Sequence, residues 1–141
     1  MKTVFLIISI IISSISFGQN TKETKLVEKT LQGYYEAFYE GKLSSFTKIA
    51  SKEIHKYGYW KTNGKFVGEP LTYEDMVKYV KRIKTESNDR DISIKEIKIF
   101  DILENTASAK LKFWWGYDYI LLAKEKDEWK VRMVLWEGPL K

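Results

Sequence analysis

Asp118 is the carboxyl group with the most unusual setting in this sequence. It stands between two tyrosines at the start of an otherwise apolar run, residues 117–123, although strands disfavour aspartate. If the side chain points into an aromatic cavity, desolvation raises its pKa and suits it to proton transfer or to accepting a ligand N–H. The alternative is a carboxylate that faces solvent or pairs with a lysine of a neighbouring strand. Alternation leaves both open, because both faces of this run are apolar.

His55 is the only histidine of the chain, and its ordinary pKa near neutrality makes it a second candidate acid–base group. Strand alternation places it on one face with Tyr57 and Tyr59. The alternative is a hydrogen-bonded ring at the mouth of a sheet. With one histidine and no cysteine, the sequence predicts no metal site. It contains no Ser-His-Asp order and no phosphate-binding glycine loop, so no cofactor is predicted either.

Tryptophan is concentrated near the C-terminal end, where four of the five lie within residues 107–136. Alternation puts Trp115 on an apolar face, whereas Trp114 and Trp136 fall on faces that also carry basic residues. An exposed tryptophan is typical of an interface, so Trp114 and Trp136 are predicted to form a homodimer interface. The predicted ligand-binding residues are Tyr35, Tyr57, Tyr59, Trp115, Asp118 and Tyr119.

The elements that must position these side chains follow from hydrophobic periodicity. A helix capped by Thr21 or Thr24 carries apolar residues at helical spacing as far as Gly41, its predicted stop. A short helix over 43–50, a strand over 53–60 and an Asn63-Gly64 hairpin into 65–67 come next. A helix follows with Thr72 as its cap. Strands are predicted over 92–103, with a bulge near 98–100, and over 107–115, 117–124 and 129–136.

Residues 1–18 have the pattern of a secretory signal peptide. A short positive start precedes an apolar run over 4–12, which is shorter than the ~20 residues of a spanning helix. Cleavage is predicted between Gly18 and Gln19, which leaves one domain over 19–141 in the periplasm or outside the cell. An N-terminal membrane anchor is the alternative. With no cysteine, the exported domain is predicted to depend on packing alone.

The net charge of +5 at pH 7 is spread along the chain. Its densest basic cluster lies at 78–84, where it reads as the solvated face of a helix. A nucleic-acid partner would need a continuous basic stripe on a recognisable module, so none is expected. After signal cleavage no membrane contact is expected either.

The order of elements resembles the nuclear transport factor 2-like superfamily. Residues 34–41 (Tyr-Tyr-Glu-Ala-Phe-Tyr-Glu-Gly) resemble its first-helix signature, and residues 55–59, 115–119, 122–124 and 129–136 resemble its lumazine-binding branch. The resemblance spans the predicted mature chain. It implies a cone-shaped α+β fold, in which a curved antiparallel sheet wraps a long N-terminal helix, and a homodimer formed through the sheet. It transfers no catalytic residue, because members include isomerases, cyclases, dehydratases and binding modules.

Three hypotheses of function follow. The first is an exported, non-catalytic domain that holds a small, flat aromatic molecule, with stacking for affinity and Asp118 for orientation. The second is an isomerase, cyclase or dehydratase with Asp118 as general base and Tyr57 or His55 as its polar partner. The third is a dimeric protein-interaction module without a pocket.

Overall fold

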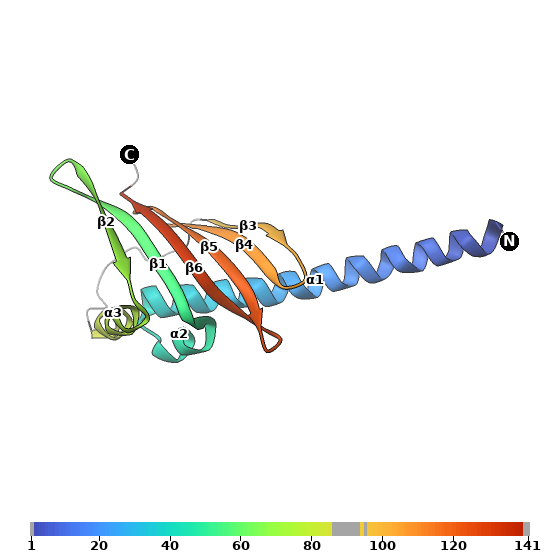
Figure 1. Cartoon of the computed structure of the whole chain (residues 1–141), viewed down its shortest axis with the longest axis horizontal. Helices are drawn as coiled ribbons and strands as arrows, with labels where there is room; N and C mark the ends of the chain where they lie inside the picture. Colours follow the sequence, from blue (N-terminus) through green and yellow to red (C-terminus); the bar gives the residue numbers. More distant parts are fainter. Residues whose placement is uncertain (1, 86–93, 95, 140–141) are drawn as a thin grey trace.

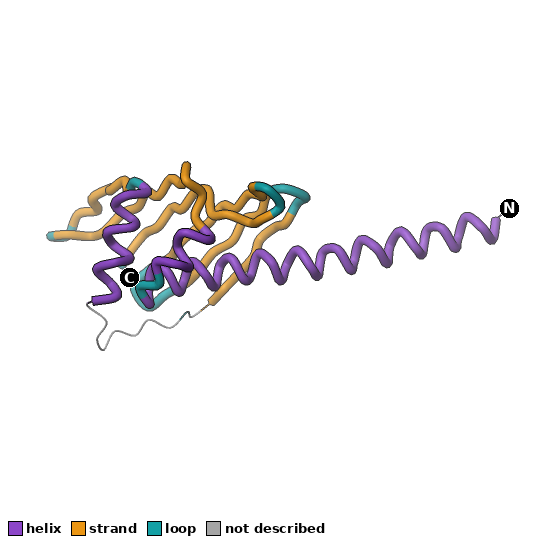
Figure 2. Tube along the Cα trace, turned by 90° about the horizontal axis from the view of Figure 1, so that it is seen from below, coloured by secondary structure: helices purple, strands orange, loops and turns teal. Residues whose placement is uncertain are grey.

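A long helix lies against the concave face of a curved sheet. The computed structural model describes residues 2–85, 94 and 96–139, and in this part α1 (Lys2–Glu40) runs across the sheet and continues beyond its edge (Figures 1 and 2). Two shorter helices, α2 (Leu43–Ile49) and α3 (Tyr73–Thr85), pack beside the C-terminal half of α1. The predicted α+β class, with a curved sheet wrapped on a long N-terminal helix, is therefore confirmed.

Six strands form one sheet in the described part of the chain, in the order β2-β1-β6-β5-β4-β3. The predicted antiparallel pairing holds for every neighbouring pair except β1 and β6, which are parallel. These two strands are far apart in the sequence, so no hairpin turn fixes their relative direction. The strands are β1 (Ala50–Thr62), β2 (Lys65–Leu71), β3 (Glu96–Ile102), β4 (Thr106–Lys112), β5 (Tyr117–Glu125) and β6 (Glu128–Gly138).

Three local signals are confirmed, namely the Asn63-Gly64 turn, the Thr72 cap and the Gly41 helix stop. Asn63 and Gly64 both have positive φ angles, 50° and 77°, as a tight hairpin of this type requires. Thr72 caps α3, because its hydroxyl accepts a hydrogen bond from the Asp75 backbone N–H at 3.2 Å. Gly41 follows α1 with a φ of 68°, a conformation that favours glycine at a helix end.

Several boundaries differ from the sequence prediction. Neither Thr21 nor Thr24 caps α1, because the helix is continuous from Lys2. The strand predicted over 92–103 is described from Glu96 to Ile102, and residues 92, 93 and 95 lie outside the described part of the chain. The predicted bulge is confirmed, since the β3–β4 register shifts between Ile99 and Asp101. Among the described residues, no helix is long and apolar enough to cross a membrane.

The core lies between α1 and the concave face of the sheet. The helix contributes its predicted apolar stripe, and Val27, Leu31 and Tyr34 are fully buried. Alternate residues of the central strands face this stripe. The buried side chains of β4, β5 and β6 are those of Ala107, Ala109, Leu111, Asp118, Ile120, Leu122, Trp129, Val131 and Val134.

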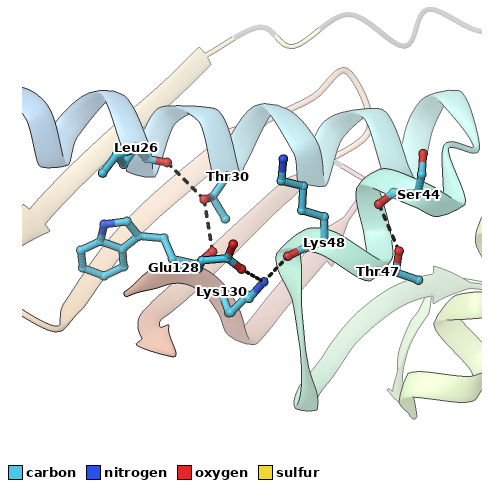
Figure 3. A network of polar contacts seen from close by, with 8 residues as sticks. Leu26, Thr30, Ser44, Thr47, Lys48, Glu128 and Lys130 are labelled. Atoms are coloured by element: carbon cyan, nitrogen blue, oxygen red, sulfur yellow. Dashed lines mark hydrogen bonds and ion pairs between the residues drawn. The ribbon is translucent and has the colours of Figure 1, made fainter. Parts of the chain in front are cut away.

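Polar contacts also join the helices to β6 (Figure 3). The Thr30 hydroxyl of α1 donates to the Leu26 carbonyl at 3.1 Å and lies 3.4 Å from the Trp129 carbonyl. The Lys130 ammonium donates to the Lys48 carbonyl of α2 at 2.6 Å. These contacts fix α1 and α2 over β6, and so position Tyr34 further along α1 above the sheet.

Candidate functional site

Three polar side chains from three elements meet in the core beneath α1. Tyr34 comes from α1, Lys56 from β1 and Asp118 from β5; the tyrosine and the aspartate are fully buried, and the lysine is 9% exposed. The Tyr34 hydroxyl donates to Asp118 Oδ2 at 2.8 Å, and Lys56 Nζ lies 3.7 Å from the same oxygen. Lys56 Nζ also donates to the Tyr34 hydroxyl. We call these three residues the buried polar cluster.

Aromatic rings also surround the Lys56 ammonium. Its nitrogen lies 4.6 Å from the centroid of the Phe38 ring and 5.1 Å from that of Tyr34. Such cation–π contacts replace part of the hydration that a buried ammonium loses. The strand therefore keeps a lysine in the core through two rings, one hydroxyl and one carboxylate.

Burial dominates the titration of the cluster. It raises the pKa of Asp118, against the opposing effects of the Lys56 ammonium and the Tyr34 hydrogen bond. It lowers the pKa of Lys56, which Asp118 opposes. It also raises the pKa of Tyr34 well above its ordinary value. The lysine and aspartate carry no net charge together, whether the proton lies on the amine or on the carboxyl group.

Two buried atoms beside the cluster lack partners. Asp118 Oδ1 and Trp136 Nε1 make no hydrogen bond within the described part of the chain. The two residues lie directly opposite each other on β5 and β6. Because buried polar atoms are normally satisfied, these two atoms are exceptions among the described residues.

Aromatic side chains continue from this point towards α1. The Trp115 ring meets that of Trp136 edge-on at 5.9 Å and lies parallel to that of Phe113 at 5.9 Å. Phe113 stacks on Tyr39 at 4.2 Å, and Tyr39 stacks on Tyr35 at 5.7 Å. These five residues form the aromatic row, which extends from Trp136 to α1.

The structure brings together only part of the predicted ligand-binding set. Asp118 lies beside Trp136, and Trp115 and Tyr35 both belong to the aromatic row. Tyr57, Tyr59 and Tyr119 instead lie on the opposite face of the sheet and are 38%, 43% and 47% exposed. The physical reason is strand alternation: Tyr119 follows Asp118 directly, so the two side chains point to opposite faces. The six residues therefore do not line one cavity.

The polar partner of Asp118 is also different from the prediction. His55 and Tyr57 lie on the exposed face, whereas Tyr34 and Lys56 reach the carboxyl group. Sequence reasoning missed Tyr34 because it fitted the apolar stripe of its helix. It missed Lys56 because a strand lysine is ordinarily solvated. Strand alternation could have indicated this position, because it places Lys56 on the face opposite to His55, Tyr57 and Tyr59.

The predicted interface tryptophans do not share a face. Trp114 lies between β4 and β5 and is 54% exposed. Trp136 is half-buried on the concave face, where a Cβ on Gly58 would come within 2.2 Å of its ring. Glycine at position 58 therefore lets this ring pack directly against β1. The face predicted for Trp114 from strand alternation was wrong, because β4 ends at Lys112 and Trp114 lies outside the strand.

Apolar side chains of β1, β5 and β6 lie next to one another on the outer face of the sheet. In register, Leu135 of β6 lies between Tyr57 and Tyr119, and Met133 pairs with Leu121. These side chains are between 38% and 51% exposed. We call these five residues the outer apolar patch. It differs from the predicted tryptophan pair in its residues, but lies on the sheet, as that prediction supposed.

A surface groove is separate from the buried polar cluster, and the described residues contain no candidate metal site. A groove between α1 and β3 is lined by residues that include Glu28, Gln32, Ile97 and Ile99, and it shares no residue with the buried polar cluster. Within the described residues, no group of three or more histidine, cysteine, aspartate or glutamate side chains could hold a metal ion.

Comparison with known proteins identifies the family. The model of the family described as "Putative lumazine-binding" matches residues 22–137. The chain belongs to this family. Asp118 and its partners Tyr34 and Lys56 all lie within the matched residues. No curated protein matches it in sequence.

Solved structures show the same fold at low sequence identity. A nuclear transport factor 2-like protein of unknown function from Silicibacter pomeroyi DSS-3 has 9% identity and a TM-score of 0.60, over 83% of this chain and 96% of that one. Another, from Methylobacillus flagellatus KT, has 15% identity and a TM-score of 0.60, over 84% and 94%. A putative scytalone dehydratase from Novosphingobium aromaticivorans DSM 12444 has 12% identity and a TM-score of 0.59, over 88% and 89%. These structures show that the chain has the nuclear transport factor 2-like fold.

Proposed function

We propose that this domain binds a small, flat molecule on the concave face of its sheet, between the aromatic row and Asp118. The observation that carries the proposal is the unpartnered Oδ1 of a fully buried carboxyl group. Leaving a buried polar atom unsatisfied costs ~1–3 kcal/mol. A ligand that donates a hydrogen bond to Oδ1 removes this cost on binding, and the family description supports a small ligand.

The surroundings of Asp118 favour a flat ligand. Trp115 and Phe113 present parallel rings, and Trp136 meets the first of them edge-on. Stacking on such rings contributes beyond the buried area. Of the predicted ligand-binding residues, the proposal keeps Tyr35, Trp115 and Asp118.

Tryptophan fluorescence tests this proposal, because Trp115 and Trp136 both lie at the site. The purified protein is titrated with a panel of pterins, flavins and indoles. We expect saturable quenching by at least one member, and the same response in Trp114→Phe, which removes a tryptophan that lies outside the site. The proposal would be overturned if no member of the panel quenches the fluorescence in a saturable way.

A catalytic role is the second candidate, and the contacts at Asp118 are the observation that favours it. An isomerase, cyclase or dehydratase needs a base and a hydrogen-bond donor, and here Asp118 lies beside the Tyr34 hydroxyl and the Lys56 ammonium. If the unaltered protein turns over a substrate, Asp118→Asn should abolish that turnover. Circular dichroism should show that the variant is still folded. Turnover that is unchanged by this substitution would exclude the role.

We further propose that the protein is an exported homodimer. Export rests on the signal-like residues 1–18, and mass spectrometry of protein expressed in an exporting bacterium should find Gln19 at the N-terminus.

Dimerisation rests on the outer apolar patch, because a second copy would bury aromatic and aliphatic side chains that water now contacts. A dimer is also consistent with the hypothesis of a protein-interaction module. The buried polar cluster favours ligand binding over that hypothesis.

A further inference from the structure

The surface groove between α1 and β3 lies outside the site of the proposed function. Its volume is about 610 Å³, within the range of about 300–1,000 Å³ that small-molecule sites occupy. Its floor consists of Ile97 and Ile99 of β3, and its wall consists of the α1 residues Thr24, Lys25, Glu28, Lys29 and Gln32. None of these residues belongs to the buried polar cluster or to the aromatic row. A molecule can therefore bind here without entering the core.

The floor of the groove is apolar and partly in contact with water. Ile97 and Ile99 are directly opposite Leu111 and Ala109 of β4, whose side chains are buried under α1. Residues directly opposite in a sheet share a face, so both isoleucines lie on the concave side. At this edge the cover is incomplete, and Ile97 is 41% exposed. A ligand that covers this side chain with hydrocarbon removes apolar surface from water.

The wall of the groove carries a net positive charge. Lys25 and Lys29 are four residues apart on α1, which places them on the same side of the helix. Within the residues that the structure describes, neither ammonium group forms an ion pair. The Glu28 carboxylate also lines the groove. Two ammonium groups and one carboxylate leave a single positive charge, which a monoanion balances.

The edge of β3 is poorly suited to a peptide strand, the other common occupant of such a position. Although β3 is an edge strand, its pairing with β4 shifts in register between Ile99 and Asp101. The exposed residues Glu96 and Lys98 also place charges along it. Bulges and charged side chains are features that protect sheet edges from added strands. The groove therefore fits a small ligand better than an extended peptide.

We propose that this groove binds a fatty acid. The hydrocarbon chain lies on Ile97 and Ile99 and along the aliphatic parts of the lysine side chains, which bury readily while their charged ends stay in water. The carboxylate pairs with the ammonium groups of Lys25 and Lys29. This site is separate from the concave face beside Asp118, so the inference does not rest on the proposed function.

Ligands of different chain length and head group test the inference with the unaltered protein. Calorimetric titrations compare octanoate, decanoate and dodecanoate, all below their micelle concentrations, with the cation decyltrimethylammonium. We expect each added methylene to strengthen fatty acid binding about two- to fourfold. Decyltrimethylammonium should bind at least about tenfold more weakly than decanoate, because it meets two ammonium groups. The inference would be overturned if no fatty acid binds, or if decanoate and decyltrimethylammonium bind equally well.

Protein variants locate the bound fatty acid. Lys25→Gln/Lys29→Gln should weaken decanoate binding about fivefold, because it removes two exposed ion pairs. Lys78→Gln/Lys81→Gln on α3 changes the net charge equally, but outside the groove, and should bind decanoate as the unaltered protein does. Ile97→Ser should also weaken decanoate binding about fivefold, because it removes apolar floor.

Two results with these variants would overturn the inference. One is unchanged decanoate affinity in Lys25→Gln/Lys29→Gln or in Ile97→Ser, which would place the fatty acid elsewhere. The other is an equal loss in the α3 control, which would show an effect of net charge alone. Neither result affects the proposed function, which is tested by flat compounds and the fluorescence of Trp115 and Trp136.

Discussion

Asp118 shows how one residue can be identified from sequence while its role is not. An aspartate within an apolar strand indicates that something compensates for it, and the compensation here is a lysine and a tyrosine. The lysine comes from β1 and the tyrosine from α1, so both are distant in sequence. Pairing across elements depends on the tertiary fold, which is why strand alternation alone left the direction of Asp118 open.

The dependence of Lys56 on Asp118 gives a prediction of stability. Asp118→Asn removes the carboxylate and leaves the Lys56 ammonium buried without its counter-charge, which should lower the free energy of unfolding by about 3 kcal/mol. The double variant Lys56→Met/Asp118→Asn has no buried charge and should recover a large part of that loss. Urea denaturation followed by far-ultraviolet circular dichroism measures both. A double variant less stable than Asp118→Asn would contradict the account.

At the scale of elements, local signals predicted the fold well. The Asn63-Gly64 turn, the Thr72 cap and the bulge after Ile99 each follow from the conformational preferences of a few neighbouring residues. The site was predicted less well. Residues 114 and 115 were assigned to a strand that ends at Lys112, and the parallel β1–β6 pair, which brings Gly58 against Trp136, depends on long-range topology.

The contact between α1 and the β5–β6 hairpin gives a pH-dependent prediction. The Glu23 carboxylate lies 2.9 Å from the Lys124 ammonium and accepts a hydrogen bond from Trp129 Nε1 at 2.8 Å. The Lys124 hydrogen bond, and then that of Trp129, hold the pKa of Glu23 below its ordinary value of 4.5. Because the folded-state pKa is the lower one, this contribution is complete above the unfolded-state pKa and is lost as the pH falls through the folded-state pKa.

Glu23→Gln should therefore lower the free energy of unfolding by about 1 kcal/mol at pH values near neutrality. The difference between the variant and the unaltered protein should vanish in acid, once Glu23 is protonated in both the folded and the unfolded state. Urea midpoints measured across the acid range give the comparison. A difference that stays constant through acid pH would show that the charge of Glu23 is not the cause.

At the scale of the whole molecule, the two faces of the sheet have different characters. The concave face is covered by α1 (Figure 2). It holds the buried polar cluster, while the outer face exposes the outer apolar patch. Aromatic residues are divided between the two faces. The aromatic residues of the sequence therefore belong to two surfaces. We propose that a ligand binds one of them and that a second copy of the chain covers the other.

Dimerisation through the outer face is tested by one charge at the centre of the patch. Leu135→Lys should weaken self-association about tenfold or more, because it places an unpaired ammonium in an apolar interface. Leu103→Lys is the control, because Leu103 is also exposed but lies outside the patch. Sedimentation velocity should show dimers for the unaltered protein and the control, and monomers for Leu135→Lys. A monomeric unaltered protein would exclude this assembly.

The central claim is that a ligand occupies the concave face beside Asp118 and Trp136. The most direct measurement is the tryptophan indole region of a nitrogen–proton correlation spectrum, recorded during titration with a compound that quenches fluorescence. We predict that the Trp136 Nε1–H resonance, assigned through its loss in Trp136→Phe, shifts on saturation as it gains an acceptor, while that of exposed Trp114 stays in place. A saturated complex in which the Trp136 resonance does not move would contradict the account.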